Sequence, residues 1–137
     1  MGTTISMPVD FDWVRARSQC SLNVVFKELH NSVQNDVRVM ELILPPSSQV
    51  KLSVTAFDRV RFSVVREVDG SFPDSVNFTL ANGAIIAEDD ENTFRHTATL
   101  TLNNEGKCKL TVGNDELDQW QFRRMALEKL FFAPRKS

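Results

Sequence analysis

The chain has 137 residues, enough for one domain that buries a core without metal or disulfide crosslinks. Its 16 basic and 18 acidic side chains give a net charge of −2, which is ordinary for a soluble protein and opposite in sign to a typical nucleic-acid-binding surface. No apolar run is long enough to span a bilayer, so we expect no membrane contact.

The two ends of the chain are predicted to be tails around a single domain, with residues 1–9 as the N-terminal tail, 10–133 as the domain and 134–137 as the C-terminal tail. The first nine residues have neither a basic start nor a long apolar run, so they predict no signal peptide and favour the cytoplasm. Cys20 and Cys108 lie far apart and outside any metal-type spacing, which predicts reduced, buried thiols. The alternative is a single disulfide in an exported protein.

A long helix is predicted from a stripe of apolar residues that begins at Leu22. The preceding residues, 10–21, fit either a short helix or an extended lead-in, and Ser18 or Ser21 can cap the long helix through its hydroxyl group. Two successive prolines at 45 and 46 end the helix. Steps of three and four place one stripe on one face, formed by Leu22, Phe26, Leu29, Val33, Val37, Met40 and Leu44.

Alternating apolar residues between positions 50 and 87 predict four strands with one face in the core. The first two cover 50–56 and 60–64, and the step from Val64 to Val65 breaks the alternation, which predicts a bulge. The next two cover 76–80 and 84–87. Asn82-Gly83 between them predicts a two-residue hairpin turn, because both positions need a positive φ.

The last part of the domain is predicted as two more strands, 94–102 and 108–112, and a helix. That helix begins at a cap formed by Asn114 or Asp115 and ends at Ala133, with Trp120 in its apolar stripe. In chain order the elements predict an α+β domain. It comprises a long N-terminal helix, an antiparallel meander of about five to six strands and a C-terminal helix, with both helices packed on one face of the sheet.

The predicted core joins both helices to the sheet. Arg123 falls among apolar residues of the last helix, where an unpaired buried guanidinium would be costly. We therefore expect its tip to reach water, to pair with a carboxylate such as that of Glu116, or to face a ligand anion. The residues predicted to be largely buried are Trp120, Leu127, Phe131, Phe26, Leu29, Val33, Leu100 and Leu110.

Motifs with a defined chemistry are absent from the sequence, so we predict no catalytic residue, no metal site and no cofactor. His96 is predicted on the apolar face of its strand, where a hydrogen-bonded core residue and a catalytic base are the alternatives. His30 is predicted on the exposed flank of the first helix. The acidic run 88–91 lacks the ligand spacing of a calcium loop and predicts a solvated loop.

Basic residues on the predicted strands raise the alternative of nucleic-acid binding through the sheet. No aromatic side chains interleave with them, so bases would have no stacking platform. A solubilising outer face that discourages edge aggregation is the expected role instead. The set comprises Lys51, Arg59, Arg61, Arg66, Arg95, Lys107 and Lys109.

Apolar residues outside the predicted core stripes indicate the function that we expect. A helix that is apolar around much of its circumference either is deeply buried or covers a partner. We therefore predict a non-catalytic interaction or regulatory module that self-associates or binds a protein partner. The predicted interface residues are Val24, Val39, Leu42, Phe122, Met125 and Phe132.

The alternative is a small-molecule-binding domain or an enzyme, with a pocket between the helices and the sheet. In that case the pocket is expected to be lined by His96, Cys108 and Arg123, which the pattern directs towards the interior.

Overall fold

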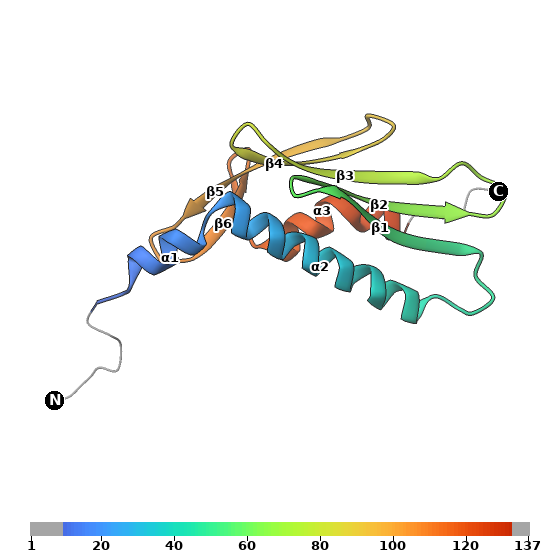
Figure 1. Ribbon diagram of the computed structural model, residues 1–137, viewed down its shortest axis with the longest axis horizontal. Helices are drawn as coiled ribbons and strands as arrows, with labels where there is room; N and C mark the ends of the chain where they lie inside the picture. Colours follow the sequence, from blue (N-terminus) through green and yellow to red (C-terminus); the bar gives the residue numbers. More distant parts are fainter. Residues whose placement is uncertain (1–9, 133–137) are drawn as a thin grey trace.

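A computed structural model describes residues 10–132 and has an antiparallel sheet with two long helices on one face (Figure 1). The helices are α1 (Trp13–Gln19), α2 (Leu22–Ile43) and α3 (Gln119–Phe132). The strands are β1 (Val50–Asp58), β2 (Arg61–Val68), β3 (Asp74–Ala81), β4 (Ala84–Asp89), β5 (Arg95–Leu102), β6 (Cys108–Val112) and β7 (Asp115–Leu117). The predicted α+β class is confirmed, with seven strands in the order in which they occur in the chain.

Helix α2 matches its predicted extent and buried stripe. Ser21 caps it by accepting a hydrogen bond from the backbone N–H of Val24, and the two prolines lie just beyond its last turn. The short segment before it is a helix, α1, and none of the α1 residues is buried. The residues of α2 that face the sheet are Val25, Phe26, Leu29, Val33, Val37 and Met40.

The hairpin between β3 and β4 confirms the turn predicted from Asn82-Gly83. Asn82 has a φ of 54° and Gly83 a φ of 74°, and Ala81 pairs with Ala84 across the turn. The bulge predicted at Val64–Val65 is wrong, because β2 runs past that step in regular register with both neighbours. The irregularity lies instead on β1, between Ala56 and Asp58.

The beginning of the last helix is a correction to the sequence prediction. Residues 115–117 form β7, which pairs with β6 after a tight turn at Gly113, whose φ is 61°. Helix α3 therefore begins at Gln119 and not at Asn114 or Asp115. Leu117, which was predicted in the apolar stripe, therefore lies outside the helix, and the buried residues of α3 are Phe122, Ala126, Leu127 and Leu130.

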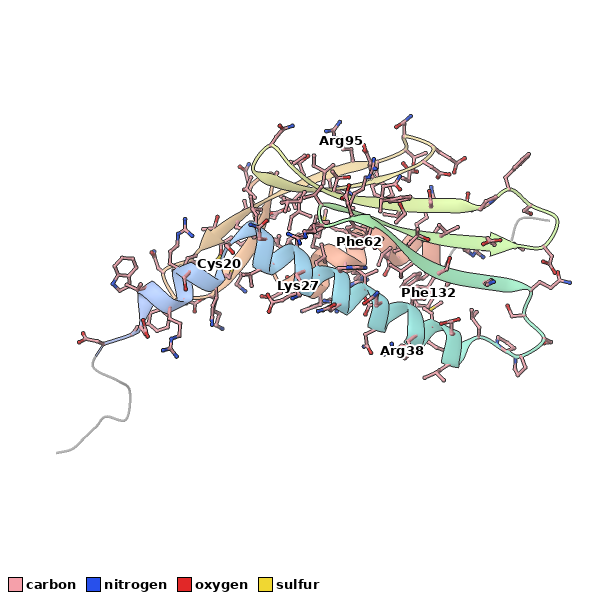
Figure 2. All side chains as sticks on the ribbon, in the orientation of Figure 1. Cys20, Lys27, Arg38, Phe62, Arg95 and Phe132 are labelled. Carbon is pink, nitrogen blue, oxygen red and sulfur yellow. A yellow bond between two sulfur atoms is a disulfide. The ribbon has the colours of Figure 1, made fainter. Side chains whose placement is uncertain are left out.

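The core is organised around four phenylalanines that connect α2, the sheet and α3. The rings of Phe26 and Phe62 are 5.3 Å apart, those of Phe62 and Phe78 are 4.8 Å apart, and Phe122 meets Phe78 edge-on at 6.4 Å. Figure 2 labels Phe62, which lies between the sheet and the helices. Offset and edge-on ring pairs of this kind add stabilisation beyond the area that they bury.

Most of the predicted core residues are buried, but Trp120 is not. Its side chain is 52% exposed, whereas Phe122 is fully enclosed. Helix α3 thus turns Phe122, and not Trp120, towards the sheet. Leu100 and Phe131 are partly buried, and the residues confirmed as buried are Leu127, Phe26, Leu29, Val33 and Leu110.

The prediction of reduced thiols is wrong, because Cys20 and Cys108 form a disulfide. The bond joins the junction of α1 and α2, where Figure 2 labels Cys20, to the first residue of β6. The two residues are 88 positions apart in sequence, yet their Cα atoms are 5.4 Å apart. The pairing depends on how α2 lies across the sheet, which the spacing of two cysteines cannot reveal.

Candidate functional site

The three residues predicted to line a pocket are engaged in separate structural contacts. His96 stacks on Phe94 with ring centres 5.0 Å apart, and Cys108 is bound in the disulfide. The guanidinium of Arg123 donates from Nε to Asp36 of α2 at 2.8 Å and from Nη1 to Gln119 at 2.7 Å. Pairing with a carboxylate was one of the outcomes expected for Arg123, but its partner comes from the other helix. The three residues do not form one site.

A pocket of about 540 Å³ lies on the helix side of the sheet, beside the last turns of α3. It is bounded by the end of β2, the beginning of β3, the segment between β4 and β5, and α3. Its wall is mostly apolar, and the pocket is partly open to solvent. We name it the Arg66 pocket. Its apolar lining comes from Val68, Phe72, Val76, Phe94 and Leu130.

Strand alternation places Arg66 at the floor of this pocket. Arg66 has the same parity as Phe62 and Val64, so its side chain points to the helix side, and it is only 8% exposed. Asp74 lies directly opposite Arg66 in the register of β2 and β3 and shares that face. Lys129 of α3 lines the same pocket. The site therefore contains two cations within a largely apolar wall.

Asp89 shapes the edge of the pocket by holding the segment between β4 and β5. Its carboxylate accepts hydrogen bonds from the hydroxyl and the backbone N–H of Thr93 and from the N–H of Phe94. Desolvation raises the pKa of Asp89, but these hydrogen bonds outweigh it, and the pKa lies below its ordinary value. The turn fixes Phe94 against the pocket, with His96 stacked behind it.

Three further carboxylates meet at the mouth of the pocket. Oxygen atoms of Asp74, Asp90 and Glu91 lie within 4.8 Å of one another, and Asp90 and Glu91 are exposed. These carboxylates meet because the beginning of β3 lies beside the end of β4. The backbone N–H of Ser75 in β3 donates a hydrogen bond to Asp90, which follows β4, at 3.4 Å. Exposed acidic groups often lie this close without a bound ion, so we assign no metal to them.

The Arg66 pocket was not predicted from the sequence because of the side to which one residue was expected to point. The bulge predicted at Val64–Val65 would have turned Arg66 to the outer face, where it was counted among the basic residues of the sheet. Regular alternation from Phe62 onwards would have placed it on the helix side. Phe72, which is 95% exposed at the pocket mouth, gave no periodic signal because it lies in a loop.

The predicted partner surface is only partly present on the outside of the helices. Phe122 is fully buried and is not available to a partner in this fold. Trp120 takes its place on the surface, beside a shallow groove of about 400 Å³ on the outer side of α3. The interface itself stays a prediction. The predicted residues that are exposed are Val24, Val39, Leu42, Met125 and Phe132.

Basic residues on the outer face of the sheet interact largely within the chain. The guanidinium of Arg61 lies 5.1 Å from the ring centre of Phe57, and Arg95 lies 3.9 Å from Glu88. Lys109 donates to Asp118, which raises the pKa of the lysine above its ordinary value. These contacts fit the expected role of a mixed-charge solubilising face.

His30 lies at the edge of the core and not on an open surface. Its ring stacks on Phe62 with centres 4.5 Å apart, and its Nε2 atom is buried without a hydrogen-bond partner. Burial lowers the pKa of this imidazole, because a protonated ring would lose its hydration. The neutral form is therefore the one that the fold accommodates.

Comparison with known protein families, with characterised proteins and with solved structures found no match for this chain. Within residues 10–132, none of the helices combines the length and apolar character that crossing a membrane would require.

Proposed function

We propose that this protein is a non-catalytic binding module that takes a small organic molecule into the Arg66 pocket. The observation that carries the proposal is the pocket itself, about 540 Å³ in volume, on the boundary between α3 and the sheet. Ligand sites are commonly concave, mostly apolar and furnished with a few convergent polar groups, and this pocket has all three properties.

The chemistry of the wall supports a ligand with an apolar body and a positively charged end. Two cations and four carboxylates line the pocket, which gives its surroundings a net charge of −2 (2 − 4). Phe72 and Phe94 offer aromatic faces at the same site, and such faces attract organic cations. An anionic ligand of equal size would meet net repulsion there.

A non-catalytic role is supported by what the reactive residues already do. The thiol of Cys108 is consumed in the disulfide, and Arg123 is held by Asp36. Asp89 is committed to the turn that shapes the pocket. Of these three residues, Asp89 is the one that lines the pocket, and its commitment to the turn supports a role in positioning.

Three probes with the same ring system test this proposal. Tryptamine carries a cationic chain on the indole ring, indole-3-acetate carries an anionic one and indole carries none. NMR titration of the labelled protein reports where each binds. We expect tryptamine to bind most tightly, with shifts centred on the amides of the Arg66 pocket. Absence of pocket shifts with all three probes would refute ligand binding, and preference for indole-3-acetate would refute the charge assignment.

Two tryptophan insertions provide a matched pair for the same titration. Ser71→Trp places a large ring at the pocket mouth and should abolish the shifts, because Ser71 lines the pocket. Ser47→Trp, in the exposed loop between α2 and β1, adds the same ring elsewhere and should leave binding unchanged. Loss of binding in both variants would indicate a general effect of the ring and not occupation of the pocket.

Self-association is the second candidate function, and the exposure of Trp120 favours it. An aromatic side chain that is 52% exposed beside Met125 and the groove on α3 resembles the anchors found in protein interfaces. We expect a dimer in sedimentation equilibrium that is weakened by Trp120→Ala and unchanged by Thr97→Ala, which truncates an exposed side chain of β5. A monomer at all accessible concentrations would contradict this function.

The disulfide supports an oxidising compartment as the place of action, in contrast to the cytoplasm favoured by the sequence. Disulfides persist in exported proteins and are rare where thioredoxin and glutathione keep thiols reduced. Lysis of the source cells with N-ethylmaleimide present tests this, because a protein with an intact Cys20–Cys108 bond takes up no label. Recovery of protein carrying two labels would place it in a reducing compartment.

A further inference from the structure

Helix α1 lies at the surface of the domain. It has seven residues, none of which is buried, and its exposed side chains include Trp13 and Val14. Its cap is local, since Asp12 accepts from the N–H of Arg15. A helix this short is marginal in water by itself, so its order depends on what holds it.

A disulfide and an aromatic contact join the α1 segment to the body of the domain. The first is the disulfide from Cys20, directly after α1, to Cys108 at the beginning of β6. The second is the ring of Phe11, which lies against Gly106 so closely that a Cβ atom there would be 2.4 Å from it. Both contacts reach the same hairpin between β5 and β6. The disulfide therefore keeps Phe11 next to the glycine that receives it.

The rest of the domain is built without α1. The hydrophobic cluster of α2, the sheet and α3 includes neither an α1 residue nor Cys20. Helix α2 also has its own cap in Ser21, which lies after the disulfide. Loss of the bond consequently removes an anchor of α1 but no side chain from this cluster.

We propose that reduction of the Cys20–Cys108 disulfide releases α1 while the remainder of the domain stays folded, so that the bond acts as a redox-controlled latch. A dithiol reductant supplies two electrons: its thiolate attacks one sulfur of the bond, a mixed disulfide forms, and its second thiol resolves that intermediate. The products are two protein thiols and the oxidised cyclic disulfide of the reductant. Cys108 is exposed whereas Cys20 is buried, so we expect the thiolate of the reductant to attack the sulfur of Cys108.

Release of α1 would follow when the protein moves from an oxidising to a reducing environment. After reduction, α1 keeps the Phe11 contact but loses its covalent attachment to β6, and the ring of Phe11 is itself more than half exposed. The segment from Phe11 to Gln19 then exchanges between docked and undocked positions. The Arg66 pocket is lined by the segments between β2 and β3 and between β4 and β5, and by α3. None of these segments contacts α1 through the disulfide, so we expect the pocket to stay intact.

Limited trypsinolysis of the native protein, with and without dithiothreitol, tests the latch. Arg15 and Arg17 are exposed cleavage sites within α1. We expect cleavage there to accelerate at least tenfold after reduction, because α1 must unfold locally to enter the protease. The amide chemical shifts of α2 and of the sheet away from Cys108 should stay those of the folded protein, even though opening a loop of 88 residues lowers the global stability. The variant Cys20→Ser/Cys108→Ser should behave like the reduced protein without any reductant.

Phe11→Ala with the disulfide intact is the matched control, and it should accelerate cleavage less than reduction does. Three results would overturn the proposal. One is an unchanged cleavage rate after complete reduction. Another is loss of the native chemical shifts throughout the sheet, which would make the bond a requirement of the whole fold. The third is a bond that dithiothreitol does not reduce in the folded protein.

Discussion

Phe122 and Trp120 offer a direct test of how α3 is oriented, because the sequence and the structure rank them in opposite order. The two residues lie two positions apart, on different sides of one helix. Phe122 is fully enclosed and meets Phe78, whereas Trp120 is 52% exposed. Truncating each to alanine should therefore have unequal effects on the free energy of unfolding.

The expected magnitudes follow from burial. Phe122→Ala removes an enclosed ring and leaves a cavity, which costs about 3–5 kcal/mol. A large aromatic side chain that is about half buried hides roughly 120 Å², worth about 3 kcal/mol at 25 cal/mol per Å². Residual burial in the unfolded chain and solvent filling of the vacated space reduce that to about 2 kcal/mol or less. Phe122→Ala should thus cost about 1–3 kcal/mol more than Trp120→Ala.

Urea unfolding of both variants, with the disulfide kept oxidised, measures this difference. The slope of free energy against urea should be unchanged, so that a shift of the midpoint reports stability alone. Phe132→Ala serves as a control for removing an exposed ring from the same helix. A larger loss for Trp120→Ala than for Phe122→Ala would refute the orientation of α3.

Three further outcomes follow from individual contacts. Gly83→Val should lower the free energy of unfolding by about 1–2 kcal/mol, because Gly83 has a φ of 74° that a β-branched residue resists. Gly83→Asn should be tolerated better, and equal stability of the two variants in urea would contradict the positive φ at this turn. Stability should fall as pH drops below about 6.5, because burial lowers the pKa of His30 and the unfolded chain therefore binds the proton first. His30→Phe should weaken this pH dependence, and a variant with the same pH profile as the original protein would contradict the role of His30. A double-mutant cycle with Arg123→Met and Asp36→Asn should give a coupling energy of about 1 kcal/mol, and none would show that the pair contributes nothing to stability.

Much of the fold can be predicted from local patterns. The stripe of α2 and the Asn82-Gly83 turn each depend on residues close in sequence, and the structure agrees with both. The extent of α3 was not predictable in this way, because Asp115 and Glu116 suit a first helical turn as well as a short strand. Pairing with β6 decides in favour of the strand. Which face of the helix meets the sheet is set by packing, and there Phe122 is enclosed while Trp120 is half exposed.

The candidate site was less accessible to sequence analysis because it is assembled from distant segments. Arg66, Phe94 and Lys129 come from β2, the approach to β5 and α3. No short-range periodicity relates these positions, and one error of strand parity moved Arg66 to the wrong face. The disulfide is a similar case, because 88 residues separate its two cysteines.

The order of the sheet has a consequence for how the chain reaches this structure. Each strand pairs with the strand that precedes it in the chain, so the sheet can grow hairpin by hairpin without closing a long loop. Proteins rich in such local pairings fold faster than β-sandwiches of similar size. The contacts that span most of the chain are those between the two long helices and the Cys20–Cys108 bond. We therefore expect the meander to form early, and the joining of the first and last parts of the chain to set the folding rate.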